Sequence, residues 1–152
     1  MSGSIKRSLV LLCALLTIAP QCIAGDHDWT VVTLTRNGMW GVVSDSSQSQ
    51  AMSEAIRLCR ATAGPLAGCG AQLTAAKGGW IIANLCGDHQ VMATGSSLVD
   101  AEQEALNLEI SLQLFYVPDL PPCKRILTVD STGTIAPSVS SIPQQLPPYT
   151  NS

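Results

Sequence analysis

Short apolar runs and turn signals alternate along the chain from residue 29 onward. Residues 29–34 (WTVVTL) are rich in β-branched residues and predict a strand. Asn37-Gly38 is a strong signal for a tight hairpin, so residues 39–44 predict the returning strand. Residues 69–76 predict a third strand.

A helix is predicted between the second and third of these strands. Ser46 and Ser47 supply an N-cap, and Gly64-Pro65 stop the helix after about Arg60. Its apolar residues recur at helical spacing and predict one buried face, made of Ala51, Met52, Ala55, Ile56 and Cys59.

The same order of elements recurs about fifty residues later. Residues 80–85 and 90–94 predict a second hairpin, a helix follows Ser96-Ser97, and residues 123–129 predict the last strand. The second helix is expected to turn four residues inward, namely Ala101, Ala105, Leu106 and Leu108. Shifted by fifty, six residues of the first unit have identical counterparts in the second: Ser46, Ser47, Ala51, Glu54, Ala55 and Leu58.

The repeated unit of strand, strand, helix and strand predicts an α+β fold. Hairpins favour antiparallel pairing, so we expect a mostly antiparallel sheet. Each helix has one apolar face, so we expect both helices to cover one face of that sheet.

The first twenty-four residues predict a secretory signal peptide. Lys6 and Arg7 precede an apolar run over residues 9–19, and Cys22-Ile23-Ala24 places small residues where signal peptidase requires them. The apolar run is too short to span a membrane. Cleavage after Ala24 predicts a periplasmic or secreted protein with no membrane span in the mature chain.

Cleavage leaves 152 − 24 = 128 residues, a length that suits one domain. Residues 25–130 predict a single α+β domain stabilised by disulfides. Residues 131–152 are rich in Ser, Thr, Pro and Gln and lack charge and periodicity, so we expect a disordered tail.

The mature chain is acidic. It keeps 8 − 2 = 6 basic and all 11 acidic side chains, which gives a net charge of 6 − 11 = −5. This charge argues against binding to nucleic acid and suits a basic partner protein. Solubility alone is the other explanation for the charge. The sequence predicts no cofactor.

Four cysteines remain after cleavage: Cys59, Cys69, Cys86 and Cys123. An even number of cysteines in an exported chain predicts two disulfides, for which three pairings are open. A zinc site is the competing interpretation, but the sequence lacks CxxC and HxxxH spacing.

The order of these motifs resembles the exported bacterial domain family DUF4189, a domain of unknown function. The resemblance covers about residues 29–129 and rests on Trp40-Gly41, Ser46-Ser47, the helix ending in Cys59, and Leu85-Cys86-Gly87. Family members often carry a cysteine at the end of the second helix, where this chain has Glu109. The resemblance therefore implies a local Cys59–Cys69 bridge, which leaves Cys86 to pair with Cys123.

Few residues are candidates for catalysis. A small exported hydrolase would use His89 with a serine, and Ser96 and Ser97 are the nearest in sequence, but helix capping explains both. Glu102 and Glu109 are seven residues apart and share a helix face that we expect to be solvated. The sequence has no GxSxG motif.

Three tryptophans are notable in a chain with one Phe and two Tyr. Trp29 and Trp80 hold equivalent places in the two repeats, which fits large side chains filling a small core. The alternative is that Trp29, Trp40 and Trp80 are exposed anchors for a partner.

Cleavage after Ala24 would also expose the terminus Gly25-Asp26-His27. Its amine, two backbone amides and the His27 ring would form a square-planar nitrogen set, which suits Cu(II) or Ni(II). The hypothesis depends on that one cleavage site.

Taken together, these features favour an exported, non-enzymatic protein-binding module. A concrete version is an immunity or inhibitor protein that neutralises a secreted toxin or a wall-degrading enzyme. The alternatives are the His89 hydrolase and a structural or stress protein of the envelope.

Overall fold

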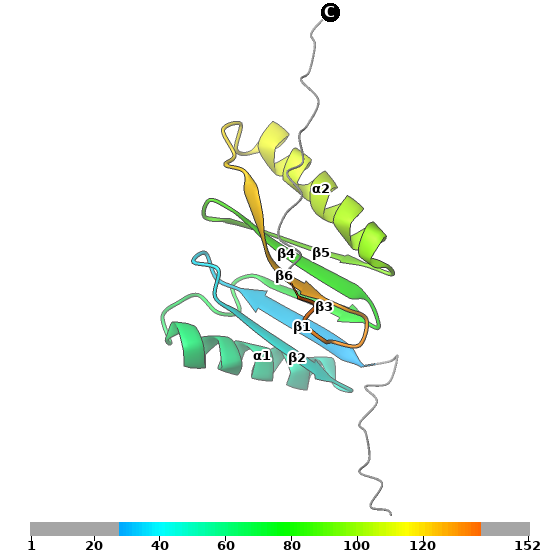
Figure 1. Cartoon of the computed structure of the whole chain (residues 1–152). Coiled ribbons are helices and arrows are strands. Elements are labelled where there is room, and N and C mark those ends of the chain that lie inside the picture. The colour runs from blue at the N-terminus through cyan, green and yellow to red at the C-terminus, as the bar shows by residue number, and fades with distance from the viewer. Residues whose placement is uncertain (1–27, 138–152) are drawn as a thin grey trace, which may run out of the picture.

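The computed structural model describes residues 28–137 (Figure 1). Six strands and two helices form within this range, in the order that the sequence predicts. Their bounds are β1 Trp29–Leu34, β2 Trp40–Asp45, α1 Gln48–Ala63, β3 Leu73–Lys77, β4 Trp80–Cys86, β5 His89–Gly95, α2 Leu98–Phe115 and β6 Cys123–Val129. The expected α+β class and antiparallel pairing are confirmed.

Each repeat builds its own three-stranded antiparallel sheet. The strand orders are β2-β1-β3 and β5-β4-β6, so the first strand of each repeat lies in the centre. Trp29 pairs with Asp45 and Trp80 pairs with Gly95, which gives the two hairpins matching registers. The expected single sheet is therefore divided into two.

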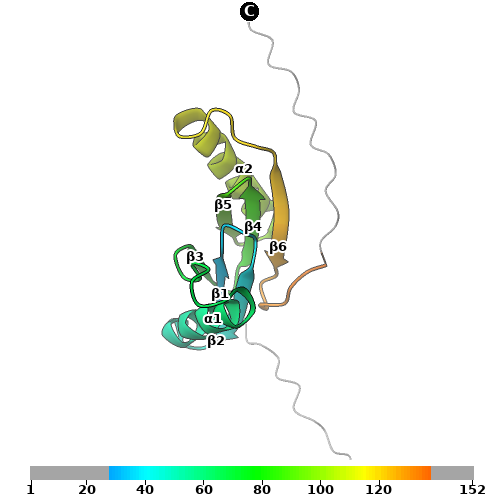
Figure 2. The same ribbon diagram turned by 90° about the vertical axis from the view of Figure 1, so that its left-hand side faces the viewer.

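The two sheets face each other, and each helix covers the outer face of its own sheet. Figures 1 and 2 show α1 and α2 on opposite sides of the strands rather than side by side. The reason lies in the central strands, which are apolar on both faces. Val31 packs against α1 while Val32 faces the other sheet, and Ile82 packs against α2 while Ile81 faces the other sheet. One helical layer could not cover both faces.

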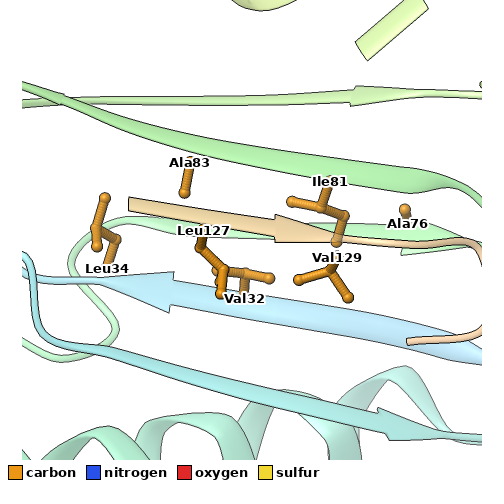
Figure 3. Close-up of a cluster of buried hydrophobic side chains, with 7 residues drawn as sticks. All are labelled: Val32, Leu34, Ala76, Ile81, Ala83, Leu127 and Val129. Atoms are coloured by element: carbon orange, nitrogen blue, oxygen red, sulfur yellow. The ribbon is translucent and has the colours of Figure 1, made fainter. Parts of the chain in front are cut away.

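The main core lies between the sheets (Figure 3). It draws side chains from β1, β3, β4 and β6 and consists of Val32, Leu34, Ala76, Ile81, Ala83, Leu127 and Val129. A register shift between Ala83 and Asn84 allows Ile126, next to Leu127, to pack against the same core.

Small residues bring the helices close to the sheets. Ala51, Ala55, Ala101 and Ala105 are buried as expected. A Cβ on Gly41 would lie 2.1 Å from the Ala55 carbonyl oxygen, so β2 and α1 meet backbone to backbone.

Both helices begin as predicted, because Ser47 and Ser97 accept hydrogen bonds at their N-caps. None of the helices within residues 28–137 is long and apolar enough to cross a membrane.

Ordered backbone continues past the expected domain boundary at residue 130. Val129 pairs with Ile135, and the Ala136 amide donates a hydrogen bond of 2.9 Å to the Thr128 carbonyl. The Asp130 carboxylate accepts hydrogen bonds from Thr132 and Thr134 and closes the intervening turn. The beginning of the expected tail thus folds back along β6. Residues 138–152 lie outside the described residues.

Two disulfides form, Cys59–Cys69 and Cys86–Cys123. The first joins α1 to the segment before β3, and the second joins direct cross-strand partners on β4 and β6. The pairing implied by the family resemblance is the one observed.

Candidate functional site

The three tryptophans are divided between half-buried and exposed positions. Trp80 packs against the cluster between β4, β5 and α2, and Trp29 lies at the same place in the first sheet with the Lys77 ammonium 6.0 Å from its ring centroid. Trp40, at the start of β2, is 38% exposed. Trp80 thus helps to cover its helical interface, Trp29 is half-buried at the equivalent place, and Trp40 is the most accessible of the three in the described chain.

His89 lies apart from the two serines nearest in sequence. Its imidazole Nε2 is 3.4 Å from the Asp88 carboxylate at the tip of the second hairpin. Ser96 and Ser97 follow the far end of β5, roughly 20 Å away for a strand of this length. Ser96 donates a hydrogen bond to the Asp100 carboxylate, and Ser97 accepts one from the Asp100 amide. Both serines therefore cap α2 and do not meet His89.

A polar cluster joins α2 to the second sheet. The Asn84 side chain, only 6% exposed, donates to Glu109 at 2.5 Å and accepts from Arg125 Nε at 2.8 Å. Arg125 also donates to the Thr128 hydroxyl at 3.2 Å and lies 3.7 Å from Glu102. We call this the Asn84 cluster: Asn84, Glu102, Glu109, Arg125 and Thr128.

The Asn84 cluster corrects the expectation that Glu102 and Glu109 share a solvated helix face. Glu102 is exposed but lies beside Arg125, whereas Glu109 is half-buried against the sheet. One Glu109 carboxylate oxygen and the sulfurs of Cys86 and Cys123 lie within 4.8 Å of one another. The sequence marked Glu109 as the residue opposite Cys59 and as a neighbour of Glu102 on one helix face, but helical spacing alone could not show that Asn84 holds it.

A groove of about 340 Å³, lined by both apolar and uncharged polar side chains, runs between the edge strands β3 and β5 and along α2. No charged residue lines it. We call it the α2 groove, and its lining residues are Gln72, Leu73, Thr74, Gln90, Val91, Met92, Leu108, Ser111, Leu112 and Tyr116. Leu108, which we expected to be buried, is 38% exposed at this groove.

The last turn of α2 extends the apolar surface beside the groove. Leu114, Phe115 and Tyr116 are 68%, 75% and 78% exposed. Sequence reasoning missed this surface because apolar residues surround the second half of α2 on all sides, so its pattern does not define one inward face. The aromatic pair at the helix end was the available signal.

A second hollow of about 520 Å³ lies between β2 and the start of α1 and contains two carboxylates, Asp45 and Glu54. Both make local contacts. Asp45 accepts from the Ser47 amide at 2.7 Å, and Glu54 pairs with Arg57 at 2.5 Å. Arg57 holds the pKa of Glu54 below its ordinary value through this hydrogen bond. The pKa of Glu54 is thus shifted away from the raised value that a general acid needs.

His27 and the proposed Gly25-Asp26-His27 terminus lie outside the described residues, as does the signal peptide of residues 1–24. The sequence matches no protein-family model, no curated protein and no solved structure. Membership of DUF4189 therefore stays a hypothesis that rests on the motifs themselves.

Proposed function

We propose that this chain is a periplasmic or secreted protein-binding module that catalyses nothing, and that it belongs with the DUF4189 domains. The α2 groove, together with the exposed end of α2, is the observation that carries the proposal. Its partner is a basic exported enzyme or toxin, which the chain inhibits by binding an extended apolar segment of it.

The groove suits an extended segment because unpaired edge strands lie beside apolar side chains. β3 and β5 each form the edge of a sheet, so their outward backbone groups are available to a guest strand. Leu108, Leu112 and Met92 offer apolar contacts for alternate side chains of that strand. Phe115 and Tyr116 add aromatic side chains of the kind that dominate binding energy.

Rigidity and charge support the same function. The Cys59–Cys69 and Cys86–Cys123 disulfides fix the two sheets locally, which lowers the ordering cost of association. A net charge of −5 after cleavage, from 6 − 11, accelerates encounter with a basic partner.

The test is affinity capture with the mature protein from envelope and secreted fractions, followed by enzyme assays on each captured protein. We expect recovery of a basic secreted hydrolase or toxin whose activity falls when the protein binds. The Tyr116→Ser variant is used as bait in a parallel capture, and it should not recover that partner. Substrate turnover by the purified protein, abolished by His89→Ala, would overturn the proposal.

A further inference from the structure

The end of the second sheet gathers four side chains of the types that bind zinc. Cys86 ends β4, Cys123 begins β6 and His89 begins β5. Cys86 is the direct cross-strand partner of both Cys123 and His89. Paired residues of antiparallel strands point to the same face, so all three side chains leave the sheet on the α2 side, where Glu109 lies.

Three of these positions, Cys86, Cys123 and Glu109, are held together by more than the disulfide. The flanking pairs of the β4–β6 ladder, Leu85 with Lys124 and Asn84 with Arg125, keep the two cysteines opposite each other. The Asn84 hydrogen bond holds the Glu109 carboxylate beside them. When the S–S bond opens, the two thiols and the carboxylate oxygen therefore start within about 4.8 Å of one another, as these atoms lie now.

We propose that Cys86, Cys123, Glu109 and His89 form a zinc site when the Cys86–Cys123 disulfide is reduced. Thiolate sulfur, imidazole nitrogen and carboxylate oxygen are the ligand types of tetrahedral zinc. This inference goes beyond the proposed binding function and does not depend on it.

The chemistry balances with a dithiol as the reductant. The dithiol gives two electrons and two protons to the S–S bond, which opens to two thiols, and the dithiol leaves as its own disulfide. Zn²⁺ then displaces the two thiol protons to solvent and binds both thiolates. Cys123 is only partly buried and gives the reductant and the metal access, while Cys86 is fully buried.

The surroundings of His89 fit this role. Its Nε2 lies 3.4 Å from the Asp88 carboxylate, so the ring must turn to bring Nδ1 to the metal and must then make this contact again. A carboxylate on the second ring nitrogen is the usual partner of a zinc-bound histidine, because it fixes the ring and increases its basicity. Asp88 would supply that support.

The other disulfide provides an internal control. Cys59 and Cys69 join a helix to a loop segment, and Cys86, Glu109 and Cys123 form the only group of potential metal ligands found within residues 28–137. Reduced Cys59 and Cys69 are therefore expected to bind zinc no better than two free thiols.

The experiment uses the mature protein, oxidised or fully reduced by a dithiol that is then removed without oxygen. Co²⁺ reports on the site through thiolate-to-metal charge-transfer absorption, and Zn²⁺ affinity follows from competition with a coloured chelator. We expect one metal ion per reduced chain and none in the oxidised chain. Glu109→Gln and His89→Ala should each weaken zinc binding about tenfold or more, and C86A/C123A should abolish it.

Alkylation mapping tests the reduced wild-type protein without relying on the folding of any variant. Bound zinc should protect Cys86 and Cys123 from alkylation and leave Cys59 and Cys69 reactive. Protection of Cys59 and Cys69 instead, or equal zinc affinity in wild type and C86A/C123A, would overturn the assignment.

Discussion

Glu109 holds in α2 the position that Cys59 holds in α1, fifty residues earlier. Cys59 connects its helix to Cys69 by a disulfide, whereas Glu109 connects its helix to Asn84 on β4 by a hydrogen bond. The cysteine that begins the last strand of the second repeat, Cys123, pairs across the sheet with Cys86. The first repeat thus ties its helix to the segment before its edge strand by a disulfide, and the second ties its helix to the central strand by a hydrogen bond.

Replacing Glu109 should destabilise the fold more than replacing an exposed glutamate on the same helix. Glu109→Ala leaves the buried Asn84 amide without an acceptor, which costs about 1–3 kcal/mol. Glu104→Ala, on the exposed side of α2, should change the free energy of unfolding by no more than about 0.5 kcal/mol. Urea unfolding measures both, and equal effects would show that the Asn84 cluster does not stabilise the fold.

Removing the disulfide that closes the longer loop should cost more stability, because the loss rises with the logarithm of loop length. The Cys59–Cys69 and Cys86–Cys123 bridges span 10 and 37 residues. Loop-closure entropy then predicts losses of about 3 and 4 kcal/mol for C59A/C69A and C86A/C123A. Urea unfolding of the two double variants checks the order, and peptide mapping of the unreduced protein checks the pairing. A Cys69–Cys86 peptide would contradict the structure.

The sequence was sufficient to predict the local elements, because each depends on signals within a few residues. The Asn37-Gly38 hairpin and the Ser47 and Ser97 caps are examples. It did not predict that the repeats separate into two facing sheets. Val31 and Val32, like Ile81 and Ile82, show that both faces of a strand are apolar, but not whether a helix or a second sheet covers each face.

The candidate sites were harder to predict than the elements, because they join residues far apart in the sequence. The α2 groove brings Leu73 and Met92 to Leu112, and the cysteine cluster brings Glu109 to Cys86. Neither has a spacing that a sequence motif would record. Phe115 and Tyr116 at the end of α2 were the only local signal for the groove. The sequence alone could not show that they are exposed, because their exposure depends on which elements pack against the helix end.

Gly41 should tolerate no side chain. A Cβ at this position would lie 2.1 Å from the Ala55 carbonyl oxygen, so Gly41→Ala must push α1 away from β2. We expect a loss of about 3 kcal/mol, the upper end for overpacking. Gly64→Ala is the control, because its Cβ meets nothing within 4 Å and only its φ of 91° is strained, at a cost of about 1 kcal/mol. Similar losses for both variants would argue against the close helix contact.

Asp100 should contribute stability that disappears in acid. Hydrogen bonds from Ser96 and Ser97 hold the pKa of Asp100 below its ordinary value. The contribution is therefore complete above about pH 4, the pKa of an unfolded aspartate, and is lost as the pH falls through the lower folded pKa. Asp100→Asn should be less stable than wild type at pH 7 and should approach it near the acid limit. Urea unfolding of both proteins at pH 7 and in acid measures the difference, and an equal difference at both would contradict the prediction.

The last prediction tests the α2 groove as the binding surface. Tyr116 lines the groove and is 78% exposed, so Tyr116→Ser removes an aromatic contact without opening the core. Loss of such an anchor typically weakens binding about 30-fold, measured as Kd for the captured partner. Val99→Ser is the control, because Val99 is 73% exposed at the start of the same helix and outside the groove. Higher salt should slow association of all three proteins with a basic partner, because screening weakens steering by the acidic surface. If Val99→Ser weakens binding as much as Tyr116→Ser, or if salt leaves the association rate unchanged, the partner binds elsewhere or is not basic.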